Sequence, residues 1–180
     1  MRVNKIIVKN LILLIGIGWG VLLFGYVISR YYQIEWNAST SMPQKLWVTH
    51  VGDTKLKVGD YVVIKFHDFR MLNPHDYEYV VKQVGGVAGD LIMVRKWNGY
   101  KDGTPQPNKN ILIYVLPTGT YQVFDIISGN HFTPLTTVNM TIPEGCYFLH
   151  GQQHPSFDSR YKEFGLICKK QIYGRTYPIF

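Results

Sequence analysis

Hydrophobic positions are unevenly spread along this chain, and the segment Leu11–Ile28 carries no charged side chain. As an α-helix rising ~1.5 Å per residue, this segment would be about 27 Å long, close to the ~30 Å hydrocarbon core of a bilayer. A buried helix of a soluble domain would need a larger core than the rest of the chain supplies. A cleaved signal peptide has a shorter apolar run followed by small residues, whereas Ser29-Arg30-Tyr31-Tyr32 follows here. The pattern therefore predicts a retained transmembrane anchor.

Beyond the anchor, the pattern changes to short apolar runs separated by turn-forming residues. The polar segment Gln33–Thr40 is expected to be a connector, and Trp97–Asn110 a turn-rich loop. The chain is therefore predicted to divide into 1–30, the N-terminus and anchor, and 31–180, one mainly β domain of short strands and long loops. The expected strands are Asp60–Phe66, Glu78–Val84, Asp90–Arg95, Ile111–Val115, Tyr121–Ile127 and Cys146–His150.

Composition agrees with a folded β domain. Hydrophobic residues make up 46% of the 180 residues and charged residues 17%, which excludes wholesale disorder. Thirteen Tyr, nine Phe and four Trp favour β structure over a helical bundle. The two cysteines, Cys146 and Cys168, exclude a dense disulfide framework and a four-cysteine zinc site. A disulfide between them and two buried free thiols both remain open.

The net charge of +7 is concentrated at one end of the chain. Residues 1–30 contain Arg2, Lys5, Lys9 and Arg30 and no acid, so they carry +4 and leave only +3 for the remainder. Because there is no long Lys/Arg run, no nucleic-acid partner is expected. Three of the four basic residues precede the anchor. The positive-inside rule then places the N-terminus in the cytoplasm and the β domain on the trans side, in a periplasm or outside the cell.

The first candidate for chemistry is Ser41, which follows Ser39 by two positions in the segment NASTSMPQKLW. Clustered Ser, Thr and Pro are typical of a surface turn. However, Ser41 comes shortly after the predicted anchor, so it must stay near the bilayer surface. A nucleophile at this position reaches only substrates that are themselves in or at the membrane.

The second candidate is Lys82, which lies inside an apolar β-type run, YVVKQVGGVAGD. Such a lysine can lie on a solvated face of its strand, or it can point inwards. In the inward orientation, desolvation lowers the pKa of the amine, and a neutral amine can accept a proton from a serine hydroxyl. The sequence leaves both orientations open.

The third candidate segment is Gly151–Gly165, in which Asp158 and Arg160 can form a salt bridge. The same residues would also suit an ordinary turn-stabilising loop. Just beside them, His150 and His154 have the i, i+4 spacing of two zinc ligands on a helix. Because a glycine and a proline adjoin these histidines and disfavour a helix, no metal site is expected.

Together, the three segments resemble the bacterial signal peptidase I family of serine endopeptidases, and in particular its conjugative-transfer branch, the TraF-type pilin peptidases. The anchor and the motifs follow one another in the family's order, so the resemblance covers nearly the whole chain. Lys45 and Ala88 stand where the family usually has glycine and proline, which puts the local loop geometry in question. The matching segments are Asn37–Pro43 for N-x-(S/T)-x-S-x-P, Lys82–Asp90 for K-x-V-x-G-x-P-G-D, Ser156–Tyr161 for S-x-D-S-R-Y, and Ile172–Arg175 for I-x-G-(R/K).

The resemblance implies a signal-peptidase-like β domain with a Ser-Lys dyad and with no metal and no cofactor. Ser41 would be the nucleophile and Lys82 the general base. The backbone N–H of Ser41 and the hydroxyl of Ser39 would form the oxyanion hole. The implied supporting residues are Ser156, Asp158 and Arg160.

The function implied by the resemblance is that of a membrane-anchored serine endopeptidase in the bacterial inner membrane. Its expected partners are the lipid bilayer and a polypeptide precursor, which in this branch is a conjugative pilin that some members also close into a ring. Two alternatives remain: a general signal peptidase acting on many preproteins, and a non-enzymatic single-span subunit of a conjugation or secretion machine. The stretch Trp97–Met140 has no expected role and is expected to lie farthest from the motifs.

Overall fold

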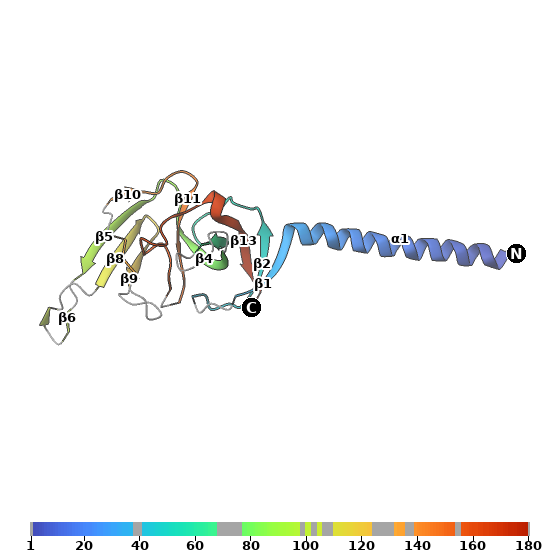
Figure 1. The fold of residues 1–180 in the computed structure, drawn as a ribbon, viewed down its shortest axis with the longest axis horizontal. Helices are drawn as coiled ribbons and strands as arrows, with labels where there is room; N and C mark the ends of the chain where they lie inside the picture. Colours follow the sequence, from blue (N-terminus) through green and yellow to red (C-terminus); the bar gives the residue numbers. More distant parts are fainter. Residues whose placement is uncertain are drawn as a thin grey trace.

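The computed structural model consists of one long N-terminal helix followed by a β domain (Figure 1), which confirms the predicted fold class. It describes residues 2–37, 41–67, 77–97, 100–101, 104–105, 110–123, 132–135, 139–153 and 156–179. The elements are α1 (Arg2–Tyr31), β1 (Tyr32–Trp36), β2 (Leu46–Val51), β3 (Tyr61–Phe66), β4 (Glu78–Gly86), β5 (Leu91–Trp97), β6 (Tyr100–Lys101), β7 (Thr104–Pro105), β8 (Asn110–Leu116), β9 (Gly119–Val123), β10 (Met140–Thr141), β11 (Cys146–His150), β12 (Ile167–Cys168), the 3₁₀ helix η1 (Lys169–Gln171) and β13 (Ile172–Pro178).

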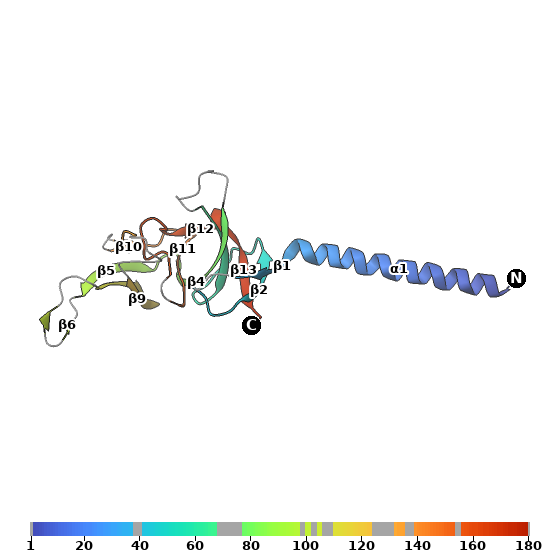
Figure 2. The same cartoon turned by 60° about the horizontal axis from the view of Figure 1, so that its bottom comes forward.

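Helix α1 projects away from the β domain, as Figures 1 and 2 both show. Its segment Ile7–Tyr31 is 25 residues long and contains an 18-residue window whose mean hydropathy is 2.5 and which is not buried within the protein. Large apolar side chains such as Leu14 and Phe24 are 65% and 67% exposed. This length and composition are those of a membrane-spanning helix. Since β1 begins at Tyr32, directly after the helix, the β domain has no linker to separate it from the helix end.

Two main antiparallel sheets make up the β domain. The larger has seven strands in the order β1-β2-β13-β3-β4-β11-β12, and the smaller has four in the order β10-β5-β8-β9. The small hairpin β6–β7 lies at the end of the domain farthest from α1 (Figure 1). In β3, the consecutive residues Val62, Val63 and Ile64 are all fully buried, so both faces of this strand are covered. The strand that carries Lys82, β4, lies between β3 and β11.

Most of the predicted strands are confirmed. β3, β4, β5, β8 and β11 agree with the sequence prediction to within two residues at each end. β9 begins at Gly119, two residues earlier than predicted, and positions 124–127 of that prediction lie outside the described residues.

The prediction of a polar connector at Gln33–Thr40 is wrong for its first half. Residues Tyr32–Trp36 form β1, which pairs antiparallel with β2 so that Ile34 is opposite Val48. The Trp97–Asn110 loop likewise contains the hairpin β6–β7. Both errors have the same cause, because short strands with polar residues are stabilised by their partners rather than by their own hydrophobic pattern.

The core is divided into three clusters. Phe157 packs against both the first and the second cluster, so the segment that follows β11 is held between them. The third cluster lies directly beneath the Ser41 segment because Met42 belongs to it. Central members are Ile92, Ile113 and Phe148 in the first cluster, Val62, Ile64 and Leu149 in the second, and Met42, Trp47, Val63 and Val81 in the third.

Cys146 and Cys168 form a disulfide, which decides between the two alternatives that the sequence left open. The two residues are directly opposite each other in β11 and β12. The bond therefore closes a loop whose ends are 22 residues apart in sequence and which contains the segment Ser156–Arg160.

Candidate active site

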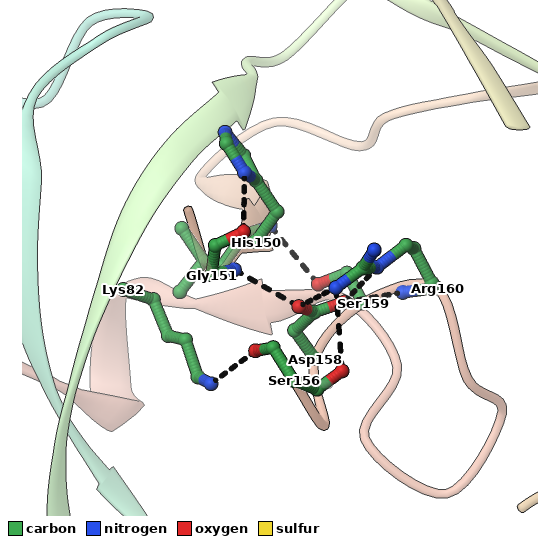
Figure 3. Close-up of polar contacts among 8 residues, drawn as sticks. Lys82, His150, Gly151, Ser156, Asp158, Ser159 and Arg160 are labelled. Atoms are coloured by element: carbon green, nitrogen blue, oxygen red, sulfur yellow. Dashed lines mark hydrogen bonds and ion pairs between the residues drawn. The ribbon is translucent and has the colours of Figure 1, made fainter. Parts of the chain in front are cut away.

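Lys82 points into the protein rather than to solvent, so the inward orientation is the one observed. It lies in the middle of β4, opposite Val62 of β3, and its side chain is only 5% exposed. Its Nζ donates a hydrogen bond to Ser156 Oγ at 2.9 Å (Figure 3). Burial lowers the pKa of Lys82 from 10.5 to about 8; nearby Asp158 opposes this change, and Arg160 adds to it. A substantial fraction of these amines is therefore neutral at mildly alkaline pH.

Ser41 is also buried, at 5% exposure, in the turn between β1 and β2. The fully buried side chain of Met42 fixes one side of this turn. The turn is closed by a hydrogen bond from Asn37 N to Lys45 O, at 2.8 Å. It is tied to the C-terminal half of the domain by a second bond, from Gln153 N to Ser41 O at 3.0 Å. These contacts hold the backbone of Ser41 against the segment that follows β11.

Gly151 is the point at which Ser41 and Ser156 meet. A Cβ atom added at Gly151 would lie 3.0 Å from the Cβ of Ser41 and would overlap the Ser156 side chain. Only glycine leaves enough room for this close approach. Because Ser156 also accepts the hydrogen bond from Lys82, it connects the Lys82 amine to the backbone position that borders Ser41.

Asp158 and Arg160 form a buried ion pair directly behind this position, with exposures of 0% and 1%. Arg160 Nε donates to Asp158 Oδ1 at 2.7 Å, and an Nη donates to Oδ2 at 2.6 Å. The same carboxylate accepts the N–H of Gly151 at 2.9 Å (Figure 3). Burial alone would raise the pKa of Asp158, but Arg160, Lys82 and the Gly151 N–H together hold it below its ordinary value of 3.8. The ionised carboxylate thus fixes the backbone of Gly151.

The structure adds a residue that the sequence analysis assigned no role, His150. Its Nδ1 lies 3.1 Å from the carbonyl oxygen of Gly151, which can only accept, so Nδ1 carries the hydrogen. Burial lowers the pKa of His150, so the ring stays neutral at physiological pH. The only sequence signal that could have placed His150 at the site is its position directly before Gly151. His154, considered with it as a zinc ligand, lies outside the described residues.

Tyr121 of β9 reaches the same region and corrects the expectation for Trp97–Met140. Its ring centroid lies 4.6 Å from that of His150, and its hydroxyl donates to Gly85 O at 3.4 Å. A Cβ at Gly85 would come within 2.5 Å of the Tyr121 hydroxyl oxygen, so this glycine makes room for the contact. Part of the stretch expected to lie farthest from the motifs therefore packs beside them. The sequence could not show this because sheet-to-sheet packing joins residues remote in sequence.

The two departures from the family motifs leave the loops intact. The carbonyl of Lys45 accepts the hydrogen bond that closes the Ser41 turn. Around Ala88, Asp90 N donates to Val87 O at 3.0 Å, and Gly89 takes the positive φ that the turn requires. Ser39, the remaining candidate, lies outside the described residues.

Among the described residues, no three His, Cys, Asp or Glu side chains gather into a metal-ligand set. A buried amine with a lowered pKa that is hydrogen-bonded to a serine hydroxyl is suited to proton transfer from a hydroxyl group. A sequence model of the family described as "Signal peptidase, peptidase S26" matches residues 5–180. The chain belongs to the signal peptidase family. A search of curated proteins returns no match.

Family membership makes this chain a serine peptidase of the signal peptidase type, with a polypeptide as its substrate. The match begins within α1 and runs to the C-terminus, so it includes the apolar helix and all the strands. Together, the helix and the family indicate membrane anchoring. The TraF-type branch is a narrower assignment than the family match provides.

Proposed function

We propose that this protein is a membrane-anchored endopeptidase in which Ser41 is the nucleophile and Lys82 the general base. The observation that carries the proposal is the buried Lys82 amine, whose pKa is lowered to about 8 and which is linked through Ser156 to the position bordering Ser41. A serine hydroxyl needs a neutral base nearby to become a nucleophile. An ammonium group in water, with a pKa near 10.5, could not serve this purpose at neutral pH.

In the proposed reaction, Ser41 Oγ attacks the carbonyl carbon of the scissile bond while its proton passes to Lys82 Nζ. The tetrahedral intermediate collapses, the C–N bond breaks, and the Lys82 ammonium returns the proton to the leaving amine. Water then attacks the Ser41 ester and gives its proton to Lys82. When the second intermediate collapses, that proton returns to Ser41 Oγ, so the enzyme is regenerated.

The other residues support this sequence of steps. Ser156 accepts a hydrogen bond from Lys82 Nζ and so orients the amine. Asp158, paired with Arg160, fixes Gly151 and with it the spacing between Ser41 and Ser156. The N–H of Ser41 and the hydroxyl of Ser39 are proposed to bind the oxyanion, where loss of one donor typically costs ~10²–10³ in turnover.

The basic residues before α1 support an orientation with the N-terminus in the cytoplasm and the β domain on the trans side. There the protein is proposed to mature a conjugative pilin precursor. Ring closure is chemically consistent with this mechanism, since an amine can attack the Ser41 ester in place of water. The motif pattern of Asn37–Pro43 and Ser156–Tyr161 supports this branch over general signal peptidases.

The test is the intact mass of a candidate pilin precursor co-expressed with the full chain. We expect truncation with wild-type protein, and an unchanged precursor mass with Ser41→Ala or Lys82→Met. Lys57→Met, which removes an exposed amine, is the matched control and should process normally. A truncated product lighter by one water than its linear form would establish ring closure.

Two outcomes would change the assignment. Full processing by both Ser41→Ala and Lys82→Met would overturn the peptidase mechanism and favour the structural-subunit alternative. Rescue of a strain depleted of its own signal peptidase would favour general processing of many preproteins over a dedicated pilin substrate.

A further inference from the structure

A cavity of about 310 Å³ opens between the strand that leads into the Ser41 turn and the strand that carries Lys82. At one side Asn37 lies four residues before Ser41, and at the other Val81 directly precedes Lys82. The proposed mechanism uses none of the lining side chains. The cavity is lined by Gln33, Glu35, Trp36, Asn37, Tyr79 and Val81.

Glu35 is the one charged residue in this lining. Burial raises the pKa of its carboxyl group, and a hydrogen bond with Thr49 partly opposes that change. Among the described residues, no lysine or arginine forms an ion pair with Glu35. Partial removal of a carboxylate from water is unfavourable, and without a cation nearby this loss of hydration is only partly compensated. A cationic side chain entering the cavity would offset that loss.

The wall beside Glu35 is aromatic. The ring of Tyr79 makes edge contacts with those of Tyr77 and Tyr173, with centroids 5.4 Å and 4.7 Å apart. Tyr77 and Tyr173 support the Tyr79 ring from outside the cavity lining, and Lys65 Nζ lies 5.3 Å and 5.4 Å from their centroids. Within the lining itself, the Glu35 carboxylate stands with the aromatic rings of Trp36 and Tyr79, a combination that favours a cation over a neutral or acidic group.

The size and place of the cavity limit what it can bind. Its volume is at the lower end of the ~300–1,000 Å³ range of ligand sites, which suits one long side chain. Trp36 and Tyr79 are 72% and 47% exposed, so the cavity is open to solvent. An extended polypeptide places alternate side chains on one face. A chain with its scissile bond at Ser41 can therefore direct a nearby side chain between β1 and β4.

We propose that this cavity binds a lysine or arginine side chain of the substrate, within a few residues of the scissile bond, and that Glu35 determines this specificity. The inference rests on the proposed endopeptidase function and adds the substrate class that the site selects. The carboxylate form of Glu35 is the one that binds the cation; burial raises the pKa of this group, and the hydrogen bond with Thr49 opposes that change.

The test uses the full-length protein in detergent micelles and a set of synthetic decapeptides. All share small residues around one central bond, and each member carries Lys, Gln or Glu at one of the flanking positions. At low salt, one position should show kcat/KM about tenfold higher for Lys than for Gln, as expected for a hydrogen bond to a charged group. Glu35→Gln should reduce this ratio to about twofold or less, since the amide keeps its shape but lacks the charge. Raising the salt concentration should also shrink the ratio.

Glu78→Gln is the matched control because it removes an exposed carboxylate from the same sheet without touching the cavity. It should keep the Lys-to-Gln ratio of the wild-type protein. A wild-type ratio near one at every position would overturn the inference. A ratio that survives in Glu35→Gln would do the same.

A binding measurement separates this inference from the proposed function. Affinities of the Lys and Gln peptides are measured for Ser41→Ala, with and without Glu35→Gln. Selective binding of the Lys peptide by Ser41→Ala that is lost with Glu35→Gln, together with no cleavage of any peptide by the wild-type protein, would support the cavity and overturn the endopeptidase function. Ser41-dependent cleavage without any Lys preference would support the endopeptidase and overturn the cavity's role.

Discussion

The sharpest consequence of the structure concerns the ionisation of Lys82 as pH is raised. With a pKa of about 8, roughly half of the Lys82 amines are neutral at pH 8. With the ordinary value of 10.5, only about 0.3% would be neutral at that pH, so burial increases the reactive fraction about 160-fold. The acid side of the pH dependence of kcat/KM should therefore have its midpoint near pH 8, with activity rising as pH increases.

The ionisation can be measured without a substrate. In full-length protein carrying lysine labelled with ¹³C at the ε position, the Lys82 resonance should titrate with a midpoint near pH 8. Lys82→Met identifies the resonance by its loss, and Lys57→Met, which removes an exposed amine, is the control that should leave the Lys82 resonance in place. A Lys82 midpoint above pH 10 would refute the argument from burial, and an acidic optimum for cleavage would refute the role of Lys82 as base.

The same titration has a consequence for stability. The folded protein holds Lys82 with a lowered pKa, so the unfolded chain binds more protons between pH 8 and 10. Stability contributed by this group should therefore rise with pH across that window and be lost as pH falls towards 8. The difference between 10.5 and about 8 corresponds to about 3 kcal/mol at most. Lys82→Met should remove this pH dependence.

Three further predictions concern stability, measured by urea unfolding in micelles through tryptophan fluorescence. Asp158→Asn leaves a buried guanidinium without its carboxylate and should cost about 3–5 kcal/mol, whereas Asp53→Asn, in a partly exposed ion pair, should cost about 1 kcal/mol or less. Gly85→Ala places a methyl group 2.5 Å from the Tyr121 hydroxyl oxygen and should cost about 1–3 kcal/mol, with partial recovery when Tyr121→Phe is added. Reduction of the disulfide at Cys146 should cost about 3 kcal/mol, as expected from the chain entropy of a loop with a separation of 22 residues.

Each of these has a clear contrary result. Equal losses for Asp158→Asn and Asp53→Asn would contradict the importance of burial. An unchanged free energy of unfolding for Gly85→Ala would show that the Tyr121 side chain can move away from β4 without loss of stability. An unchanged unfolding curve after reduction would show that the loop is ordered without the disulfide.

Much of the candidate site could be predicted because its residues lie in local motifs. Ser41, Lys82 and Asp158 were each picked out within a short segment, and the order of these segments indicated the family. What the motifs could not decide was the direction of Lys82. Successive residues of a strand point to opposite faces, and in β4 one face meets the core while the other would ordinarily meet solvent. Lys82 is covered because the segment that follows β11 packs against β4, and this segment supplies Ser156 as the hydrogen-bond partner of Lys82.

The sequence by itself determined the membrane-type helix, the strands with strong apolar runs and the composition of the motifs, because each depends on residues close together in the chain. Tertiary structure alone decided the pairing of β1 with β2, the disulfide, and the contact of Tyr121 with Gly85. It also created the Glu35 cavity, whose two walls are more than forty residues apart in sequence. These features depend on which strands meet, and the free energy of such long-range contacts is not encoded in any local pattern.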